Sequence, residues 1–160
     1  MEDMLQLTGH LPEVHYDPGD IIITEGGDSD GVWILVSGSL RVLKKGEEVN
    51  TVTLPGALIG EMSILLDIPD SATVEAAEPS VMRYAEDGAA LLESDPRIIR
   101  LVAVGLAERL NFVTSYLADL QQQYSDSPGI AMVPEVLRQL SQRQGPPARP
   151  GSARDPDPEY

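Results

Sequence analysis

The residues of this chain that could do chemistry gather in one short stretch, from Gly60 to Val74. The stretch begins with Gly60-Glu61, continues through an apolar run, and after Pro69 ends in small residues. A glycine lets the backbone approach a ligand closely, and the first turn of a helix offers unpaired N–H groups to an anion. The pattern therefore predicts a short helical turn, a Pro-bounded loop and a strand, with N–H groups at the helix start that are available to an anion.

Other constellations of reactive residues are incomplete. The loop Asp28–Gly31 has some features of a calcium-binding loop, but the twelfth position is Ser39 instead of glutamate, so we expect a turn. The only histidines, His10 and His15, lie near the start of the chain, and no nucleophile motif or dinucleotide-type glycine motif is present. We expect neither an enzyme nor a metal site.

Composition limits the class of protein and its partners. With 160 residues and 42% hydrophobic residues the chain is long enough for one domain with a core, and the absence of cysteine excludes disulfides. The net charge of −15, from 26 acidic and 11 basic residues, disfavours direct binding to nucleic acids or to an anionic membrane. No segment has the pattern of a leader or a membrane span, so we expect a cytoplasmic protein.

Acidic residues are concentrated around the same stretch. From Gly60 to Asp95 there are nine acidic residues, and Arg83 is the only basic one, which gives a local net charge of −8. An anion that approached this region would meet an unfavourable field.

The residues from Val14 to Ala85 form short β-rich runs separated by turn residues. The expected strands after the first are Ile21–Thr24, Val32–Ser37, Ser39–Leu43, Val49–Leu54, Ala57–Ile59, Thr73–Ala76 and Val81–Ala85. Roughly eight short strands with Gly and Pro punctuation predict a mainly β fold, a sandwich, barrel or jelly roll with flanking helices. The run Val32–Ser37 is apolar on both faces, which is typical of a strand inside such a fold.

Helical patterns flank the β region. A single turn is expected around Met4 to Leu7, a short helix over Asp87–Leu92, and a long helix over Asp95–Tyr124, where Pro96 occupies the first helical position. Apolar residues recur every three or four positions along the long helix: Ile99, Val102, Leu106, Leu110, Val113, Leu117 and Leu120. This seam has two interpretations, packing on the β domain or pairing with a second copy of the helix.

The composition changes again after Tyr124. We expect one domain over residues 1–124 and a disordered tail over residues 125–160, with at most one or two weak turns in Pro134–Gln142. The tail is too short, and its composition unsuited, to supply the packed helices and basic face of a helix-turn-helix domain.

The glycine-punctuated series resembles the cyclic nucleotide-binding domain family over about Val14 to Tyr124. The matching residues are Pro18-Gly19-Asp20, Glu25-Gly26, Val32-Trp33-Ile34-Leu35, Ser37-Gly38, Pro55-Gly56, Gly60-Glu61 and Ser71-Ala72-Thr73. The alternative barrel, a cupin, normally carries metal-binding histidines, and this chain has only His10 and His15, both near its start, so we do not expect a cupin metal site.

The resemblance implies a set of ligand contacts. In the family, backbone N–H groups and one arginine hold the cyclic phosphate, and the glutamate after the glycine holds the ribose 2′-hydroxyl. The positions implied here are Gly60, Met62 and Ser63 at the phosphate, Glu61 at the ribose, Ser71, Ala72 and Thr73 around the pocket, and Thr114 near the base. The position of the arginine is occupied by Asp70.

The replacement at Asp70 weakens the implied phosphate site. Loss of a bidentate arginine costs roughly 2–5 kcal/mol, and a carboxylate adds repulsion. We therefore expect cAMP and cGMP to bind weakly or not at all.

One alternative keeps the pocket for a neutral or cationic molecule that faces Glu61 and Asp70; another abandons the pocket and keeps the fold as an interaction or scaffold module. The leading hypothesis is a regulatory module with no cofactor, dimeric through Asp95–Tyr124 or bound there to a protein partner.

Overall fold

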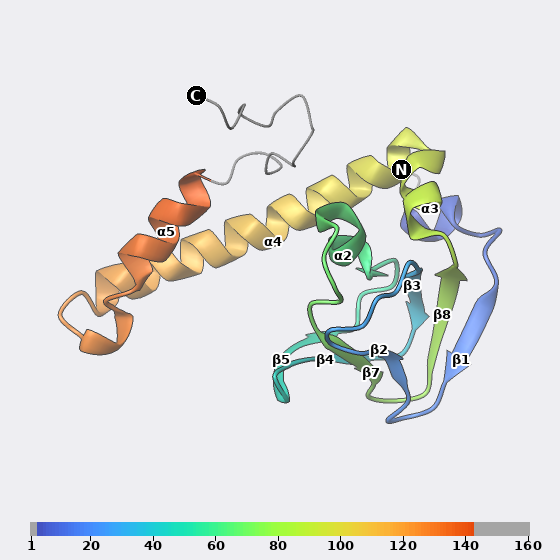
Figure 1. Cartoon of the computed structure of the whole chain (residues 1–160), viewed down its shortest axis with the longest axis horizontal. Helices are drawn as coiled ribbons and strands as arrows, with labels where there is room; N and C mark the ends of the chain where they lie inside the picture. Colours follow the sequence, from blue (N-terminus) through green and yellow to red (C-terminus); the bar gives the residue numbers. More distant parts are fainter. Residues whose placement is uncertain (1–2, 143–160) are drawn as a thin grey trace, which may run out of the picture. The chain divides into compact units, whose positions relative to one another are not determined.

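The computed structural model of the chain describes residues 3–142 (Figure 1). The chain divides into two compact units, Met1–Val104 and Gly105–Tyr160, and each is described by itself. The division lies inside the long helix α4, Pro96–Gln123, whereas the sequence placed the end of the folded domain at Tyr124.

The first unit contains two four-stranded antiparallel sheets, and this confirms the predicted mainly β fold with flanking helices. One sheet has the order β1 (Glu13–Tyr16), β8 (Ser80–Ala85), β3 (Val32–Ser37) and β6 (Leu58–Ile59). The other has the order β2 (Ile21–Ile23), β7 (Thr73–Ala76), β4 (Leu40–Lys44) and β5 (Glu47–Val52). Neighbours in each sheet are mostly distant in sequence, as in a jelly roll.

Strand β3 is buried on both faces, as its sequence predicted. Trp33 and Leu35 belong to the core, whereas Val32 packs against the start of helix α3, Gly88–Ser94. A Cβ atom added to Gly88 would lie 2.6 Å from Cγ2 of Val32, so this helix rests directly on the strand. Glycine at position 88 therefore allows the start of α3 to lie against Val32.

The core contains residues from both sheets. Its buried members are Ile23, Trp33, Leu35, Leu40, Ile59, Val74, Ala76 and Met82. The Nε1–H of Trp33 donates to the hydroxyl of Tyr16 at 3.0 Å, and the rings of Trp33 and Tyr84 lie 4.8 Å apart. Burial raises the pKa of Tyr16 above its ordinary value, although the hydrogen bond from Trp33 opposes this shift.

Helix α1, Met4–Leu7, is the single N-terminal turn that the sequence predicted. The side chains of Asp3 and Gln6 form a reciprocal capping box at its start. From β8, the guanidinium of Arg83 donates to the carbonyl of Leu5 and to Oγ1 of Thr8. Arg83 therefore ties α1 to the sheet.

Helix α4 begins at Pro96 as predicted, and its first turns belong to the first unit. Ile98 and Val102 are buried there, so this part of the helix packs within the β domain. In the second unit Leu110 and Val113 of the predicted seam are about half exposed. Of the predicted seam, Val102 is thus buried in the first unit, whereas pairing of the second half of the helix stays a proposal.

The region after α4 differs from the predicted disordered tail. A 3-10 turn, η1, occupies Pro128–Ile130, and helix α5 occupies Val133–Gln142. Within α5 the carboxylate of Glu135 accepts hydrogen bonds from Arg138, one helical turn away. The sequence predicted one or two weak turns in Pro134–Gln142, and the structure has a helix of 10 residues there. Residues 143–160 of the predicted tail lie outside the described residues.

Candidate functional site

Gly60 begins the predicted ligand-binding stretch with a conformation that requires glycine. It is the N-cap of helix α2, Glu61–Leu66, and its φ angle is +97°. A Cβ atom at this position would lie 2.8 Å from the carbonyl oxygen of Gly31. The close approach that glycine permits here is therefore to the loop before β3.

Helix α2 is short and ends in a left-handed residue. Asp67 has φ +54°, and the N–H of Ile68 donates to the carbonyl of Ser63 at 3.1 Å, which closes the helix. The chain then passes through Pro69 towards β7 (Figure 1). The predicted order of helix, loop and strand is present.

Asp70 lies inside this stretch and is only 5% exposed. Its Oδ1 accepts hydrogen bonds from Oγ of Ser63 at 3.1 Å and from Oγ of Ser29 at 3.0 Å. Its Oδ2 accepts from the N–H of Ser29 at 3.3 Å. The Asp70 carboxylate therefore joins the start of α2 to the loop between β2 and β3.

Backbone hydrogen bonds hold the same loop against the stretch. The N–H of Gly26 donates to the carbonyl of Asp70, and the N–H of Asp70 donates to the carbonyl of Gly27, both at 2.8 Å. The N–H of Glu25 donates to Oγ1 of Thr73 at 2.9 Å. A Cβ atom on Gly27 would lie 3.2 Å from Oδ2 of Asp70, so a larger residue would crowd the carboxylate.

These contacts show which groups the Asp70 carboxylate faces. One of the two alternatives from the sequence placed Asp70 and Glu61 at one ligand cavity, and the hydrogen-bond partners of Asp70 in the structure are Ser29 and Ser63 of the protein itself. Glu61 is also buried, at 4% exposure, at the first position of α2. A carboxylate with three protein hydrogen bonds has little remaining capacity for a ligand.

The other predicted contact residues are distributed over both units. Ser63 is buried, Met62 is exposed, and Ser71, Ala72 and Thr73 are half-buried in the approach to β7. Thr114 lies on α4 in the second unit, so its role at the base of a nucleotide stays a prediction.

Sequence reasoning missed Ser29, the second partner of Asp70. Ser29 is separated from Asp70 by 41 positions, and its segment was interpreted as an ordinary turn. The nearest signal was the glycine pair Gly26-Gly27, which the loop needs in order to lie against Asp70.

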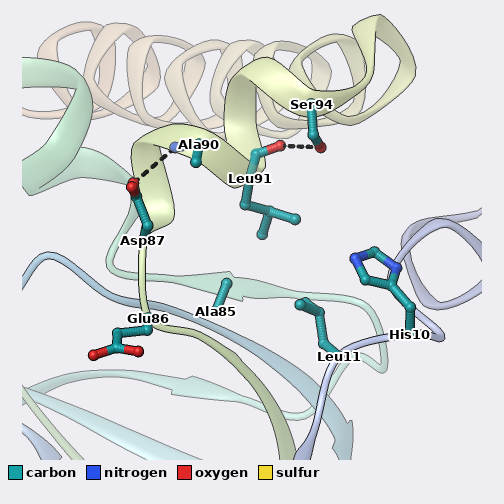
Figure 2. A pocket seen from close by; sticks show the side chains of 8 residues that line it. All are labelled: His10, Leu11, Ala85, Glu86, Asp87, Ala90, Leu91 and Ser94. Atoms are coloured by element: carbon teal, nitrogen blue, oxygen red, sulfur yellow. Dashed lines mark hydrogen bonds between the residues drawn. The ribbon is translucent and has the colours of Figure 1, made fainter.

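A separate pocket of about 270 Å³ lies elsewhere in the first unit (Figure 2). Its lining residues are His10, Leu11, Ala85, Glu86, Asp87, Ala90, Leu91 and Ser94. Two of its polar side chains serve helix α3 itself: Asp87 accepts from the N–H of Ala90, and Ser94 donates to the carbonyl of Leu91. The predicted site residues do not line this pocket, and the Gly60–Val74 stretch remains the better candidate site.

Within residues 3–142, no group of three or more His, Cys, Asp or Glu side chains is arranged to hold a metal ion. Over the same part of the chain, every helix is too short or too polar to cross a membrane.

Comparisons with known proteins agree with this geometry. The family model described as the cyclic nucleotide-binding domain matches residues 13–91. The cAMP-dependent protein kinase regulatory subunit of Yarrowia lipolytica is 38% identical over 72 residues, which cover 45% of this chain and 19% of that protein. The CRP-like cAMP-activated global transcriptional regulator of Mycobacterium tuberculosis is 30% identical over 145 residues, which cover 87% of this chain and 63% of the regulator.

A solved structure extends the comparison to three dimensions. PKAR CBD2 with bound Sp-2Cl-cAMPS is 26% identical, with a TM-score of 0.54, over 71% of this chain and 80% of that chain. The chain spans less than two thirds of the length of either curated relative. From the matched family model, the two-sheet fold and the Gly60–Val74 stretch, residues 13–91 of this chain belong to the cyclic nucleotide-binding domain family.

Proposed function

We propose that this chain is a non-enzymatic regulatory module of the cyclic nucleotide-binding type whose binding stretch is held closed by its own Asp70. In this proposal cAMP and cGMP bind weakly or not at all. The observation that carries it is the buried Asp70 carboxylate, which accepts hydrogen bonds from Ser29 and Ser63.

The proposal follows from charge and from hydrogen-bond capacity. Where the family grips a phosphate with arginine, this chain has a carboxylate, which repels the phosphate instead of neutralising it. To admit the phosphate, Asp70 would have to leave three hydrogen bonds in a buried position. Loss of the arginine partner alone corresponds to about 30-fold to several-thousand-fold weaker binding.

In this proposal the module acts through helix α4, which pairs with a second copy of the same helix or with a protein partner. In the second unit Leu110, Phe112, Val113 and Tyr116 of this helix are 46–72% exposed. Phe112 and Tyr116 stack on each other, with ring centroids 6.4 Å apart. Exposed apolar clusters of this kind are typical of interaction surfaces.

A second candidate function is a ligand-free interaction or scaffold module that retains only the fold. The same observation favours it, because a stretch closed by Asp70 needs no ligand to complete its hydrogen bonds. The two candidates differ in whether any small molecule changes the stability of the chain.

Thermal unfolding of the full chain tests the proposal. With cAMP or cGMP at about 1 mM we expect no rise in melting temperature, whereas a ligand at a hundredfold excess over its Kd stabilises by about 2.7 kcal/mol. Asp70→Arg tests whether the arginine grip can be restored, and Asp67→Asn is the matched control on the exposed end of α2. A clear rise with cAMP in the unmodified chain would overturn the proposal.

A metabolite panel separates the two candidates. Stabilisation by a neutral or cationic molecule, lost in Glu61→Gln, would favour a sensor with a changed ligand. A response confined to a protein partner would favour the scaffold.

A further inference from the structure

Helix α5 has one apolar side that is less exposed than the rest of the helix. Val133, Leu137 and Leu140 follow the spacing i, i+4, i+7, which places them on one side of a helix. Val133 is buried and the other two are half-buried, whereas the residues described between them are all exposed. We call these three residues the α5 row.

The opposite side of α5 is polar and forms hydrogen bonds within the helix. The carboxylate of Glu135 accepts hydrogen bonds from Arg138 and, at 3.0 Å, from the side-chain amide of Gln139. All three residues are exposed. The helix therefore has a solvent-facing side and a side that another element covers.

The last turns of α4 contain a matching set of covered residues. Leu117 and Leu120 of the predicted seam are half-buried in the second unit, and so is Thr114, one turn before Leu117. Leu110 and Val113 of the same seam are 50% and 46% exposed. The end of the seam is therefore covered, whereas its middle is open.

The connection between α4 and α5 brings the two helices back towards each other. The N–H of Ser127 donates to the carbonyl of Tyr124 at 2.9 Å, and the N–H of Ala131 donates to the carbonyl of Pro128 at 3.3 Å. Short connections of this kind join helices that lie antiparallel as neighbours. Both helices belong to the second compact unit, in which α5 turns back beside the end of α4 (Figure 1).

We propose that α5 is an autoinhibitory helix: the α5 row packs on Leu117 and Leu120 and occupies the end of the seam along which a second copy of α4 would pair. In the described part of the second unit, residues 105–142, α4 is the other long element that can cover this row. Pairing over the whole seam then requires the release of α5, which lowers the affinity of the dimer. The competition rests on the pairing of α4 in the proposed function, whereas the packing of α5 does not.

Thiol labelling of the full chain tests the packing of α5. The chain has no cysteine, so Leu120→Cys and Val113→Cys each introduce a single thiol, the first under the α5 row and the second outside it. At protein concentrations below the Kd of the dimer, iodoacetamide should label Leu120→Cys at least about fivefold more slowly than Val113→Cys. In concentrated urea both thiols should react at the same rate.

Matched variants of α5 show whether the α5 row causes this protection. Leu137→Ser/Leu140→Ser removes two of its side chains, and Gln139→Ser/Gln142→Ser introduces serine at two exposed positions of the same helix. The first double variant should bring the labelling rate of Leu120→Cys to within about twofold of that of Val113→Cys, whereas the control should leave it slow. Circular dichroism verifies that both double variants are folded.

Sedimentation equilibrium of the full chain without introduced cysteine tests the competition. Leu137→Ser/Leu140→Ser should dimerise at least about tenfold more tightly than the unmodified chain and the Gln139→Ser/Gln142→Ser control. Adding Val113→Ser to the first double variant should reverse this gain, because Val113 belongs to the seam that α5 is proposed to leave free.

The two measurements separate this inference from the proposed function. Equal labelling of the two thiols in the folded chain would overturn the packing of α5, whatever the oligomeric state. Slow labelling of Leu120→Cys with the same dimer Kd in all chains would overturn the competition and leave the pairing of α4 intact. Slow labelling without a dimer of any variant would overturn both the competition and the pairing of α4 with a second copy.

Discussion

The two sides of the Gly60–Val74 stretch have opposite characters. Its inner side is polar, and its hydrogen bonds are made within the protein: Asp70 is buried and accepts hydrogen bonds from Ser29 and Ser63. Its outer side is apolar and exposed, with Leu65 and Leu66 about half accessible. This difference indicates that the contacts of the inner side contribute more to stability than those of the exposed outer side.

The largest expected loss of stability tests the close approach of Gly60 to the carbonyl of Gly31. Gly60→Ala should lower the free energy of unfolding by about 3 kcal/mol, because it combines a left-handed conformation with a clash against the carbonyl of Gly31. Gly19→Ala is the matched control, since Gly19 has φ +89° but open space around it, and should cost about 1 kcal/mol. Urea denaturation measures both; equal losses would show that the contact with Gly31 carries no energy.

The next effect tests the hydrogen bonds of Asp70. Asp70→Ala should lower the free energy of unfolding by about 2 kcal/mol, because Ser29 and Ser63 lose their acceptor inside the protein. Asp70→Asn keeps an acceptor oxygen of similar size and should cost about 1 kcal/mol or less. If Asp70→Ala is as stable as the unmodified chain in urea, the inner side is not held by this carboxylate.

A smaller loss of stability is expected at a core residue outside the Gly60–Val74 stretch, and it serves as a reference for the losses within the stretch. Tyr16→Phe should cost about 1 kcal/mol, because the Nε1–H of Trp33 loses its acceptor. Burial raises the pKa of Tyr16 in the folded chain, so Tyr16 contributes stability below the ordinary tyrosine pKa of about 10 that is lost as pH rises through the folded value. Urea unfolding from pH 8 to 11 measures the slope, which Tyr16→Phe should reduce; an unchanged slope would contradict this role.

The smallest change in the free energy of unfolding is expected on the exposed outer side of the Gly60–Val74 stretch. Leu65→Ser/Leu66→Ser should change the free energy of unfolding by less than about 1 kcal/mol, since both side chains are already about half exposed. A loss as large as that of Asp70→Ala in the same urea experiment would mean that Leu65 and Leu66 belong to the core, and the contrast between the two sides would fail.

Much of the fold could be predicted from the sequence because its signals are local. The β-branched and apolar run Val32–Ser37 predicts a strand buried on both faces, and Pro96 marks the start of α4. Helix α5 was predicted only as one or two weak turns in Pro134–Gln142, because this short segment lies within a tail rich in Pro and Gly. A composition that is averaged over many residues gives little weight to a short helix among them.

The order of helix, loop and strand in the candidate site was predictable, but its contacts were not. The sequence predicted Gly60, Glu61 and Asp70 as candidate ligand contacts, with Asp70 as the departure from the family pattern. It could not identify Ser29 as a partner, because a hydrogen bond across 41 positions has no local pattern. The orientation of Asp70, which decides between a ligand site and a closed stretch, depends on that contact.

A titration of the ¹⁵N-labelled full chain with cAMP, followed by NMR, tests the central proposal most directly. The amide signals of Gly60, Met62 and Ser63 report on the start of α2, and that of Ser29 reports on its hydrogen bond to Asp70. The proposal predicts that all four signals stay unshifted up to about 1 mM cAMP. Saturable shifts of these signals at micromolar cAMP would contradict it, because they would show that the nucleotide enters the stretch that Asp70 is proposed to close.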